Sequence, residues 1–450
     1  MLRRAERPNG RSRSERGARW ATRRKLWALL VAGCVFLFAA PVLDAQARES
    51  KNNHENAATN TCLDCHSQQD PPFGINAEEF SNSIHAQKGV LCTSCHGGDS
   101  SSDDMTQAMG KAAGFKGHID RAQIPALCGK CHSDAAYMRG FNPSLRTDQL
   151  SQYKTSVHGQ RLAKGDTHVA VCTDCHTAHS IRPPNDPASS VYPTNVAKTC
   201  ARCHANADYM KEYKIPTNQY ALYSTSVHYD ALMVQGDVSA PTCSTCHGSH
   251  GAAPPGVASV ENVCSTCHVV QQETFDSGPH KNAFAAMNVA ACIACHTNHG
   301  IQQPSDAMIG TGKGAVCVTC HSDGEPGYAA AATMHADLAK LNGDIDRSDQ
   351  ILSRAEAAGV EVGEAKLALT EAKDDLTKAR VAIHSVRPEA VDQDVQAGLK
   401  VTQKTYQQGL AAMAESKYRR AGLAISLIAI VFVLIALALF IRRMEAGKRA

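Results

Sequence analysis

The stretch that decides the fold is Cys172-Thr173-Asp174-Cys175-His176-Thr177-Ala178-His179. Its first five residues form a C-x-x-C-H motif, the pattern of covalent c-type haem attachment. The two thiols add across the haem vinyl groups, and the histidine binds the iron as an axial ligand. The same pattern begins at Cys62, Cys92, Cys128, Cys172, Cys200, Cys243, Cys264, Cys292 and Cys317. These nine motifs use eighteen of the nineteen cysteines and predict nine covalent haem c groups.

Nine complete motifs in one chain exclude a chance match or a single zinc or redox site. The motifs extend from Cys62 to His321, which leaves about 29 residues per haem. Aromatic residues make up only 5% of the chain, so we expect the porphyrins to supply much of the apolar interior. The predicted fold is mainly α-helical, with short helices, extensive loops and little sheet. Disulfides are not expected, because the haems consume thiols that would otherwise suggest a disulfide framework.

The predicted haem-binding residues are the two cysteines and the histidine of each motif. They are Cys62, Cys65, His66, Cys92, Cys95, His96, Cys128, Cys131, His132, Cys172, Cys175, His176, Cys200, Cys203, His204, Cys243, Cys246, His247, Cys264, Cys267, His268, Cys292, Cys295, His296, Cys317, Cys320 and His321. Each of the nine histidines is expected to bind one iron.

The haem region also contains an internal repeat. Similar segments precede three motifs, namely Tyr153 to His158, Tyr223 to His228 and Phe275 to His280. Each of those motifs continues as C-x-x-C-H-x-x-H, ending at His179, His250 and His299, and a plain C-x-x-C-H follows 21–28 residues later. A degenerate copy begins at Ser83 and has Asp99 in the second-histidine position, where His118 is a substitute. The repeat unit is therefore a pair of haems with two additional histidines, and the Cys62 motif is the back half of a truncated unit.

Twelve of the 21 histidines lie outside the motifs, and nine of these occupy repeat-like places. These candidate distal ligands are His85, His118, His158, His179, His228, His250, His280, His299 and His335. Their number equals the number of irons that need a second axial ligand. Two imidazoles leave no open coordination site and favour one-electron transfer. His54, His168 and His384 are spare candidates, and His384 would reach a haem if the helical region that follows folds back.

Residues 1–47 are predicted to be an export signal, with a basic region, an apolar stretch from Leu26 to Ala40, and Ala45-Gln46-Ala47 as the cleavage pattern. Three alternatives remain open: an uncleaved anchor, a lipoprotein box that ends at Cys34, and a twin-arginine signal at Arg23-Arg24. The general secretory route is preferred to the last, because a c-type cytochrome acquires haem after it crosses the membrane. The net charge of +3 depends on this basic segment, and the rest of the chain is acidic. The composition therefore gives no evidence for nucleic-acid binding.

The haem domain is assigned to residues 48–327, and the chain changes character after it. Residues 328–420 contain no cysteine and show three amphipathic stripes, which predict a helical hairpin or an antiparallel three-helix bundle. The third stripe contains Val395, Leu399, Thr402, Tyr406 and Met413. Residues 421–450 contain the uncharged stretch Gly422 to Ile441, which at about 1.5 Å per residue crosses a hydrocarbon core of roughly 30 Å. We expect a C-terminal transmembrane helix with a short cytoplasmic tail.

The doubled C-x-x-C-H units resemble the superfamily that contains cytochrome c3-like proteins, pentahaem nitrite reductases and octahaem hydroxylamine oxidoreductases. The resemblance covers residues 62–321 and implies a domain built around stacked and perpendicular haem pairs. The nitrite reductases typically carry a lysine in place of one motif histidine, whereas all nine motifs here end in histidine. The hydroxylamine-oxidising relatives cross-link a tyrosine to an open haem, but nothing in this sequence selects a tyrosine for that role.

These features favour a membrane-anchored nonahaem electron carrier on the periplasmic face of the cytoplasmic membrane. It would transfer electrons singly between the quinol pool, or a quinol-oxidising or other redox partner in the membrane, and periplasmic acceptors. The alternative is a multihaem oxidoreductase that acts on a nitrogen or sulfur compound at one open haem. A filament-forming conductor is a third reading, which the terminal transmembrane helix opposes. The predicted transmembrane stretch has no histidine and no charge, so it carries no haem or proton relay of its own.

Overall fold

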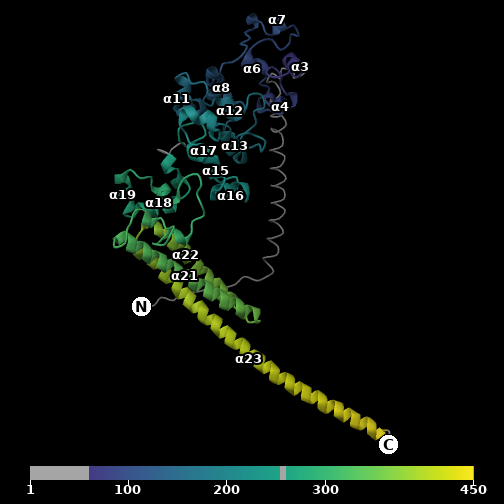
Figure 1. Ribbon diagram of the computed structural model, residues 1–450. Helices are drawn as coiled ribbons and strands as arrows, with labels where there is room; N and C mark the ends of the chain where they lie inside the picture. Colours follow the sequence, from purple (N-terminus) through teal and green to yellow (C-terminus); the bar gives the residue numbers. More distant parts are fainter. Residues whose placement is uncertain (1–59, 254–259, 449–450) are drawn as a thin grey trace, which may run out of the picture. The chain divides into compact units, whose positions relative to one another are not determined.

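The computed structural model describes residues 60–253 and 260–448, and within these ranges it contains helices and loops but no β-strand. The predicted export signal, with Cys34, and His54 lie outside the described residues. The chain divides into two compact units at His118, and each is described by itself. The mainly helical fold class is confirmed (Figure 1).

The first unit carries the motifs that begin at Cys62 and Cys92. Its helices are α3 (Thr61–His66), α4 (Ala77–Ser81), α5 (Ile84–Gln87), α6 (Cys92–His96) and α7 (Met105–Ala108), with a 3₁₀ turn η2 (Lys111–Ala113). Both motifs lie on helices of one to two turns, because a C-x-x-C-H sequence closes a single helical turn with both cysteines near one face.

The second unit begins with seven further motifs on short helices. Its helices before the last motif are α8 (Ile124–His132), α9 (Ala135–Arg139), α10 (Gln149–Thr155), α11 (Val157–Ala163), α12 (Cys172–His176), α13 (Pro193–His204), α14 (Ala207–Met210), α15 (Gln219–Tyr223), α16 (Val227–Met233), α17 (Cys243–His247), α18 (Val269–Asp276), α19 (His280–Met287) and α20 (Ala291–His296). The 3₁₀ segments are η3 (Arg121–Gln123), η4 (Lys211–Tyr213), η5 (Val260–Thr266), η6 (Asp306–Met308) and η7 (Cys317–Thr319).

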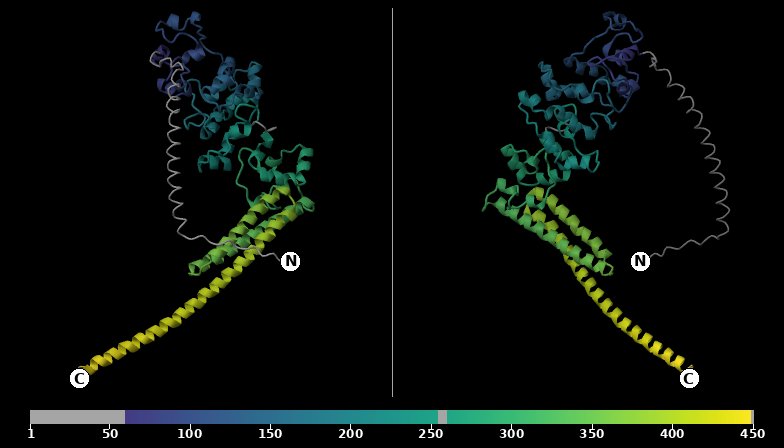
Figure 2. Two further views of the ribbon diagram at one scale, coloured as in Figure 1. Left: turned by 180° about the vertical axis from the view of Figure 1, so that it is seen from behind. Right: turned by 45° about the vertical axis from the view of Figure 1, so that its right-hand side comes forward.

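Three long helices follow the last motif and pack together as a bundle. They are α21 (Pro326–Ala357), α22 (Gly363–Ala382) and α23 (Pro388–Lys448), with the 3₁₀ turn η8 (Ile383–Ser385) between the last two. Figure 2 shows from two further directions that they lie side by side. Leu338, Leu341 and Leu369 are at most 1% exposed, as expected for residues on the predicted stripes. Each such leucine contributes roughly 2 kcal/mol through burial.

The third stripe differs from its prediction at Tyr406, which is 36% exposed. Thr405 is fully buried instead. Small residues let α23 approach α21 closely, and a Cβ atom added at Gly409 would lie 2.6 Å from the Ile351 side chain. From Gly398 to Ser416 the buried positions of α23 are therefore a row of small residues, which a search for large apolar side chains does not detect.

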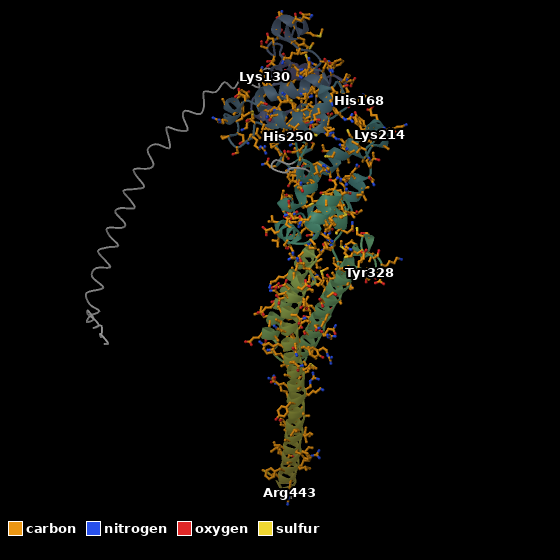
Figure 3. The ribbon with its side chains drawn as sticks, turned by 90° about the vertical axis from the view of Figure 1, so that its left-hand side faces the viewer. Lys130, His168, Lys214, His250, Tyr328 and Arg443 are labelled. Carbon is orange, nitrogen blue, oxygen red and sulfur yellow. The ribbon has the colours of Figure 1, made fainter. Side chains whose placement is uncertain are left out.

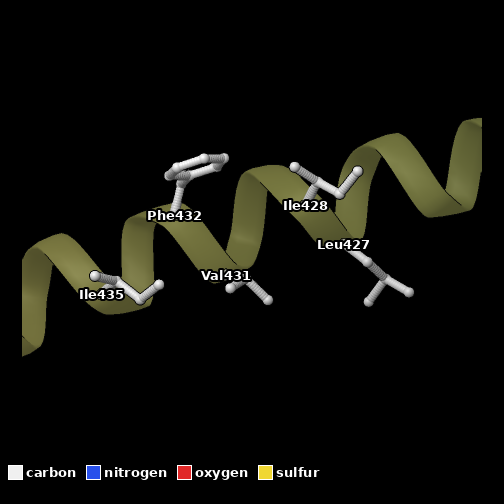
Figure 4. A pocket seen from close by; sticks show the side chains of 5 residues that line it. All are labelled: Leu427, Ile428, Val431, Phe432 and Ile435. Atoms are coloured by element: carbon white, nitrogen blue, oxygen red, sulfur yellow. The ribbon is translucent and has the colours of Figure 1, made fainter.

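Among the described helices, α23 alone is long and apolar enough to cross a membrane, and its apolar residues lie in its C-terminal part. Its most apolar 18-residue window has a mean hydropathy of 3.2 and no buried residue. Figure 4 shows Leu427, Ile428, Val431, Phe432 and Ile435 around this helix, where they line only a shallow surface depression. Arg443 lies near the far end of the helix (Figure 3). An exposed apolar helix of this length and composition fits a single-pass membrane anchor.

Candidate haem sites

Three short helices begin at a buried serine that organises a predicted distal ligand. Ser83, Ser156 and Ser226 each precede a helix, and each hydroxyl accepts a hydrogen bond from a backbone N–H of the first turn, at 3.2, 3.0 and 3.1 Å. The serines are 1%, 6% and 2% exposed. Such N-caps satisfy a backbone donor that the helix itself cannot. The histidine two residues after the serine is therefore held on the first turn of a capped helix.

Two tyrosines connect these segments to the motif that follows. The hydroxyl of Tyr153 donates to the Ala170 carbonyl oxygen at 2.8 Å, and that of Tyr223 donates to Pro241 at 2.9 Å. Each acceptor lies two residues before the first cysteine of a motif. Burial, followed by nearby thiols, raises the pKa of both tyrosines to about 12, so both remain donors at neutral pH. The hydrogen bonds therefore fix the distal-histidine segment against the motif.

The Cys172 motif is also held by an arginine that the sequence analysis does not identify. Arg121 donates to both carboxylate oxygens of Asp174, at 3.1 and 2.7 Å, and to the carbonyl oxygens of Thr167 and Val169. Asp174 also accepts from the backbone N–H of Val171 at 2.7 Å. The two charges are 53 residues apart in sequence, so no local pattern indicates the contact.

A sharp turn follows the histidine of the first motif in each of the four repeat units that contain a pair of motifs. The residues at this turn are Gly97, Thr177, Gly248 and Thr297, with φ of 69°, 65°, 81° and 61°. Their ψ values lie near 180°, in a region that glycine adopts and other residues avoid. The turn ends the motif helix and directs the second histidine of C-x-x-C-H-x-x-H away from it.

Six motif histidines face a second histidine ring. The pairs, with the distances between ring centroids, are His158–His204 at 6.1 Å, His176–His250 at 6.0 Å, His228–His268 at 6.4 Å, His247–His299 at 6.0 Å, His280–His321 at 6.0 Å and His296–His384 at 6.2 Å. An imidazole nitrogen binds a metal at about 2 Å, and the ring centre lies about 1 Å behind it, so two rings on opposite sides of one iron have centres about 6 Å apart. The residues present therefore fit a haem iron with two axial histidines.

The pairs follow a rule that relates to the repeat. The histidines that precede a unit, His158, His228 and His280, face the second motif of their own unit. The second histidines of C-x-x-C-H-x-x-H, His250 and His299, face the first motif of the preceding unit. Neighbouring units are thus interlocked, because each one contributes a ring to the unit before it.

The sixth pair involves a histidine outside the repeat. His384, one of the spare candidates, faces His296. His335 is predicted to supply a ligand from the start of the helical region; its Nδ1 atom lies 3.1 Å from the Asp306 carbonyl oxygen, which leaves Nε2 to bind a metal, and its role stays a prediction. Both histidines lie at the same end of the bundle, on different helices, and the order of residues in the chain does not show which of them reaches a motif.

Burial favours the neutral form of several of the paired imidazoles. Desolvation, followed by the charges of His250 and His132, lowers the pKa of His176 to about 4. Desolvation likewise lowers the pKa of His158, His247 and His296. Neutral imidazole is the form that binds a metal. The environment therefore favours the protonation state that ligation requires.

The remaining candidates lie in other environments. The Nδ1 atom of His66 lies 2.9 Å from the Phe73 carbonyl oxygen, and His118 ends the first unit. His168 is exposed and contacts Glu212 at 3.3 Å. His85, His96, His132 and His179 each have an interaction partner in the structure.

The cysteines of successive motifs come together in chain order. Cysteines of neighbouring repeat units lie close together in the pairs Cys62–Cys92, Cys128–Cys172, Cys200–Cys243 and Cys264–Cys292. Within each of three repeat units, a cysteine of the first motif lies near a cysteine of the second. These pairs are Cys175 with Cys203, Cys246 with Cys264, and Cys295 with Cys317. No disulfide joins any of the eighteen described cysteines. In the second compact unit these contacts link the motifs in chain order, from the Cys128 motif to the Cys317 motif.

C-x-x-C-H motifs without disulfides, paired histidines and a mainly helical fold define a class: this chain is a multihaem c-type cytochrome. Three family models match it, described as cytochrome c3 over residues 84–205, doubled CXXCH motif over residues 285–326, and cytochrome c554 and c-prime over residues 40–97.

Among curated proteins, the chain is similar to the cytochrome c-type protein NrfB of Escherichia coli. The two are 24% identical over 155 residues, which cover 34% of this chain and 65% of the relative. No solved structure matches the chain.

Proposed function

We propose that this protein is a nonahaem cytochrome c, anchored in the cytoplasmic membrane, that transfers electrons singly between a redox partner in the membrane and acceptors in the periplasm. Haem supplies one-electron chemistry through its iron. The protein supplies two thiols and a histidine for each attachment, and a second histidine that closes the iron to substrates. The observation that carries the proposal is the set of six histidine pairs, each with the span of one iron.

We assign five distal ligands from the histidines that face a motif histidine and occupy repeated sequence positions. They are His158, His228, His250, His280 and His299. His85 and His179 occupy the same sequence positions in their units, and we assign them the same role. His118 remains the candidate that replaces the second histidine of the degenerate unit, where Asp99 stands. With these ligands most irons are closed by two histidines, which favours electron transfer over binding of a small substrate.

The succession of thiols supports transfer along the chain rather than chemistry at one place. Adjacent thiols of different motifs require the attached groups to have neighbouring edges. Cys246, for example, lies close to Cys264, Cys243 and Cys267, which belong to its own motif and the next one. Seven attachment sites in one unbroken order are the arrangement that a carrier needs.

The length of α23 favours a protein partner as electron donor over direct contact with quinol. The apolar stretch begins at Gly422, which lies 34 residues after Pro388. At about 1.5 Å per residue, the start of α23 is about 51 Å along the helix axis from the apolar stretch. A tilt of about 20° shortens this rise only slightly. The haem motifs packed on that end of the bundle are therefore remote from quinol in the bilayer.

The test uses the purified mature protein. We expect nine covalent haems by pyridine haemochrome assay and intact mass, and an EPR spectrum of the oxidised protein without a high-spin haem. The reduced protein should not bind carbon monoxide appreciably. Stoichiometric carbon monoxide binding at one haem, with turnover of nitrite, hydroxylamine or sulfite, would contradict the carrier function and favour the oxidoreductase.

A further inference from the structure

His384 lies between two bundle helices and faces the histidine of a haem motif. The ring centroids of His384 and His296 are 6.2 Å apart, and the angle between the ring planes is 20°. Both the distance and the angle lie within the ranges of the other five histidine pairs. The Nδ1 atom of His384 lies 2.9 Å from the Val381 carbonyl oxygen. A proton on Nδ1 makes that hydrogen bond and leaves Nε2 as the nitrogen that can bind a metal.

The backbone around His384 allows a close approach between bundle and haem domain. A Cβ atom added at Gly278 would lie 2.4 Å from the Ser385 carbonyl oxygen, so only glycine fits there. Gly278 occupies the position that the capping Ser156 and Ser226 hold in the two preceding units. The last unit thus has a glycine where the others have a helix cap, and η8 packs against that point.

A second contact fixes the same end of the bundle. Arg380 on α22 donates two hydrogen bonds of 2.8 Å to the carboxylate of Asp306. The carbonyl oxygen of Asp306 is also the partner of His335 on α21. One residue of the haem domain therefore contacts two bundle helices, and one turn of helix separates Arg380 from His384.

We propose that His384 is the distal axial ligand of the iron held by Cys292, Cys295 and His296, so that the helical bundle completes a haem site. The inference rests on the proposed function and adds a ligand that the repeat does not predict. In earlier units the first motif receives its second ring from the unit that follows, as His176 does from His250. The Cys292 unit is the last doubled unit, so the bundle takes the place of the missing successor.

The test compares His384→Ala and His384→Met in the full-length holoprotein. His384→Ala should retain nine haems but convert one to high spin, and one carbon monoxide should bind per reduced protein. Added imidazole should restore the low-spin spectrum. His384→Met should remain low spin and raise the potential of one haem, because methionine ligation raises haem potentials. His168→Ala is the matched control, because His168 is exposed and should leave every haem unchanged.

Each outcome separates this inference from the proposed function. If His384→Ala keeps every haem low spin and binds no carbon monoxide, the ligand assignment is wrong. The same holds if His335→Ala, rather than His384→Ala, opens a haem. If His384→Ala does not accumulate, unchanged potentials in His384→Met overturn the assignment. Fewer than nine haems in the unsubstituted protein, or carbon monoxide binding to it, would contradict the proposed function and leave the role of His384 to be judged by the variants alone.

Discussion

Thr177 and Thr297 have backbone conformations that their branched side chains disfavour. Both have φ near 60°, whereas the equivalent positions in two other units are Gly97 and Gly248. A residue other than glycine in this region costs about 1–3 kcal/mol. The Thr177 hydroxyl donates to the His176 carbonyl oxygen, which offsets part of that cost. The position after the motif histidine is therefore a point of local strain that directs the second histidine.

Thr177→Gly is expected to stabilise the protein by about 1 kcal/mol, because it relieves this strain. Denaturant unfolding of the oxidised holoprotein, followed by haem absorbance, measures the change. Thr177→Ala is the control, since it removes the hydroxyl but keeps Cβ and should give no gain. A loss of stability in Thr177→Gly larger than that in Thr177→Ala would show that the conformation is not strained.

Ser156→Ala is expected to destabilise the holoprotein by about 1 kcal/mol through loss of the α11 cap. Ser156 is 6% exposed, so water does not readily replace the lost acceptor. Because His158 lies on the capped turn, the haem absorption bands should also broaden. Ser151→Ala is the comparison, since Ser151 lies on an exposed part of α10 and caps no helix. Equal effects of the two substitutions would contradict the role of the cap.

Among the elements, α23 combines two environments in one helix. Its first part packs on α21 and α22, where Val391 and Val395 are fully buried, and its second part exposes apolar side chains such as Leu423 and Ile425. A soluble protein does not leave such a surface uncovered, because every exposed methylene costs roughly 0.8 kcal/mol. The change between the two environments falls near Arg419 and Arg420, where charged residues suit the membrane interface.

Truncation before Arg419 is expected to release the haem protein from the membrane without loss of haem. Ser416 is the last buried residue of α23, so the packed part of the bundle remains complete. Fractionation of cells that mature c-type cytochromes, with haem staining of the soluble and membrane fractions, is the measurement. Retention in the membrane would mean that the N-terminal segment is a second anchor or that Cys34 carries a lipid.

Local patterns account for what could be predicted from the sequence, and contacts between distant residues account for the rest. The C-x-x-C-H motifs and the buried stripes of α21 and α22 depend on residues within a few turns, and the sequence shows both. The position of His384 opposite His296 depends on which part of the bundle meets the haem domain, and the contact of Arg121 with Asp174 joins remote segments. The Tyr406 prediction is wrong because the α23 interface selects small side chains rather than apolar ones.

At the scale of the whole molecule, the proposed membrane anchor gives the bundle a role as a spacer between the haem motifs and the bilayer. Ile351 on α21 lies beside Gly409 on α23, so the turn after α21 is near the membrane end of the bundle. The opposite end carries His335 and His384 and contacts the haem domain. Close packing between α21 and α23 makes this separation rigid, and the separation should therefore match the size of a particular membrane partner.

A heptad inserted after Tyr418 should reduce electron transfer from membrane-bound donors while leaving chemical reduction by dithionite unchanged. Seven residues lengthen a helix by about 10.5 Å and turn it by only about 20°, so the haem domain would move away from the membrane with nearly the same orientation. The same heptad inserted after Glu445 is the control, because it lengthens only the tail. Equal donor-driven reduction rates in the two insertion variants would show that the spacing does not matter.

The succession of motifs in the second compact unit has a consequence for the proposed carrier function, because attachment sites linked in chain order act in series. Cys246 lies close to Cys264 and to Cys243, and Cys243 lies close to Cys200. We therefore expect that loss of a haem in the middle of this order leaves two halves that each titrate normally but exchange electrons more slowly.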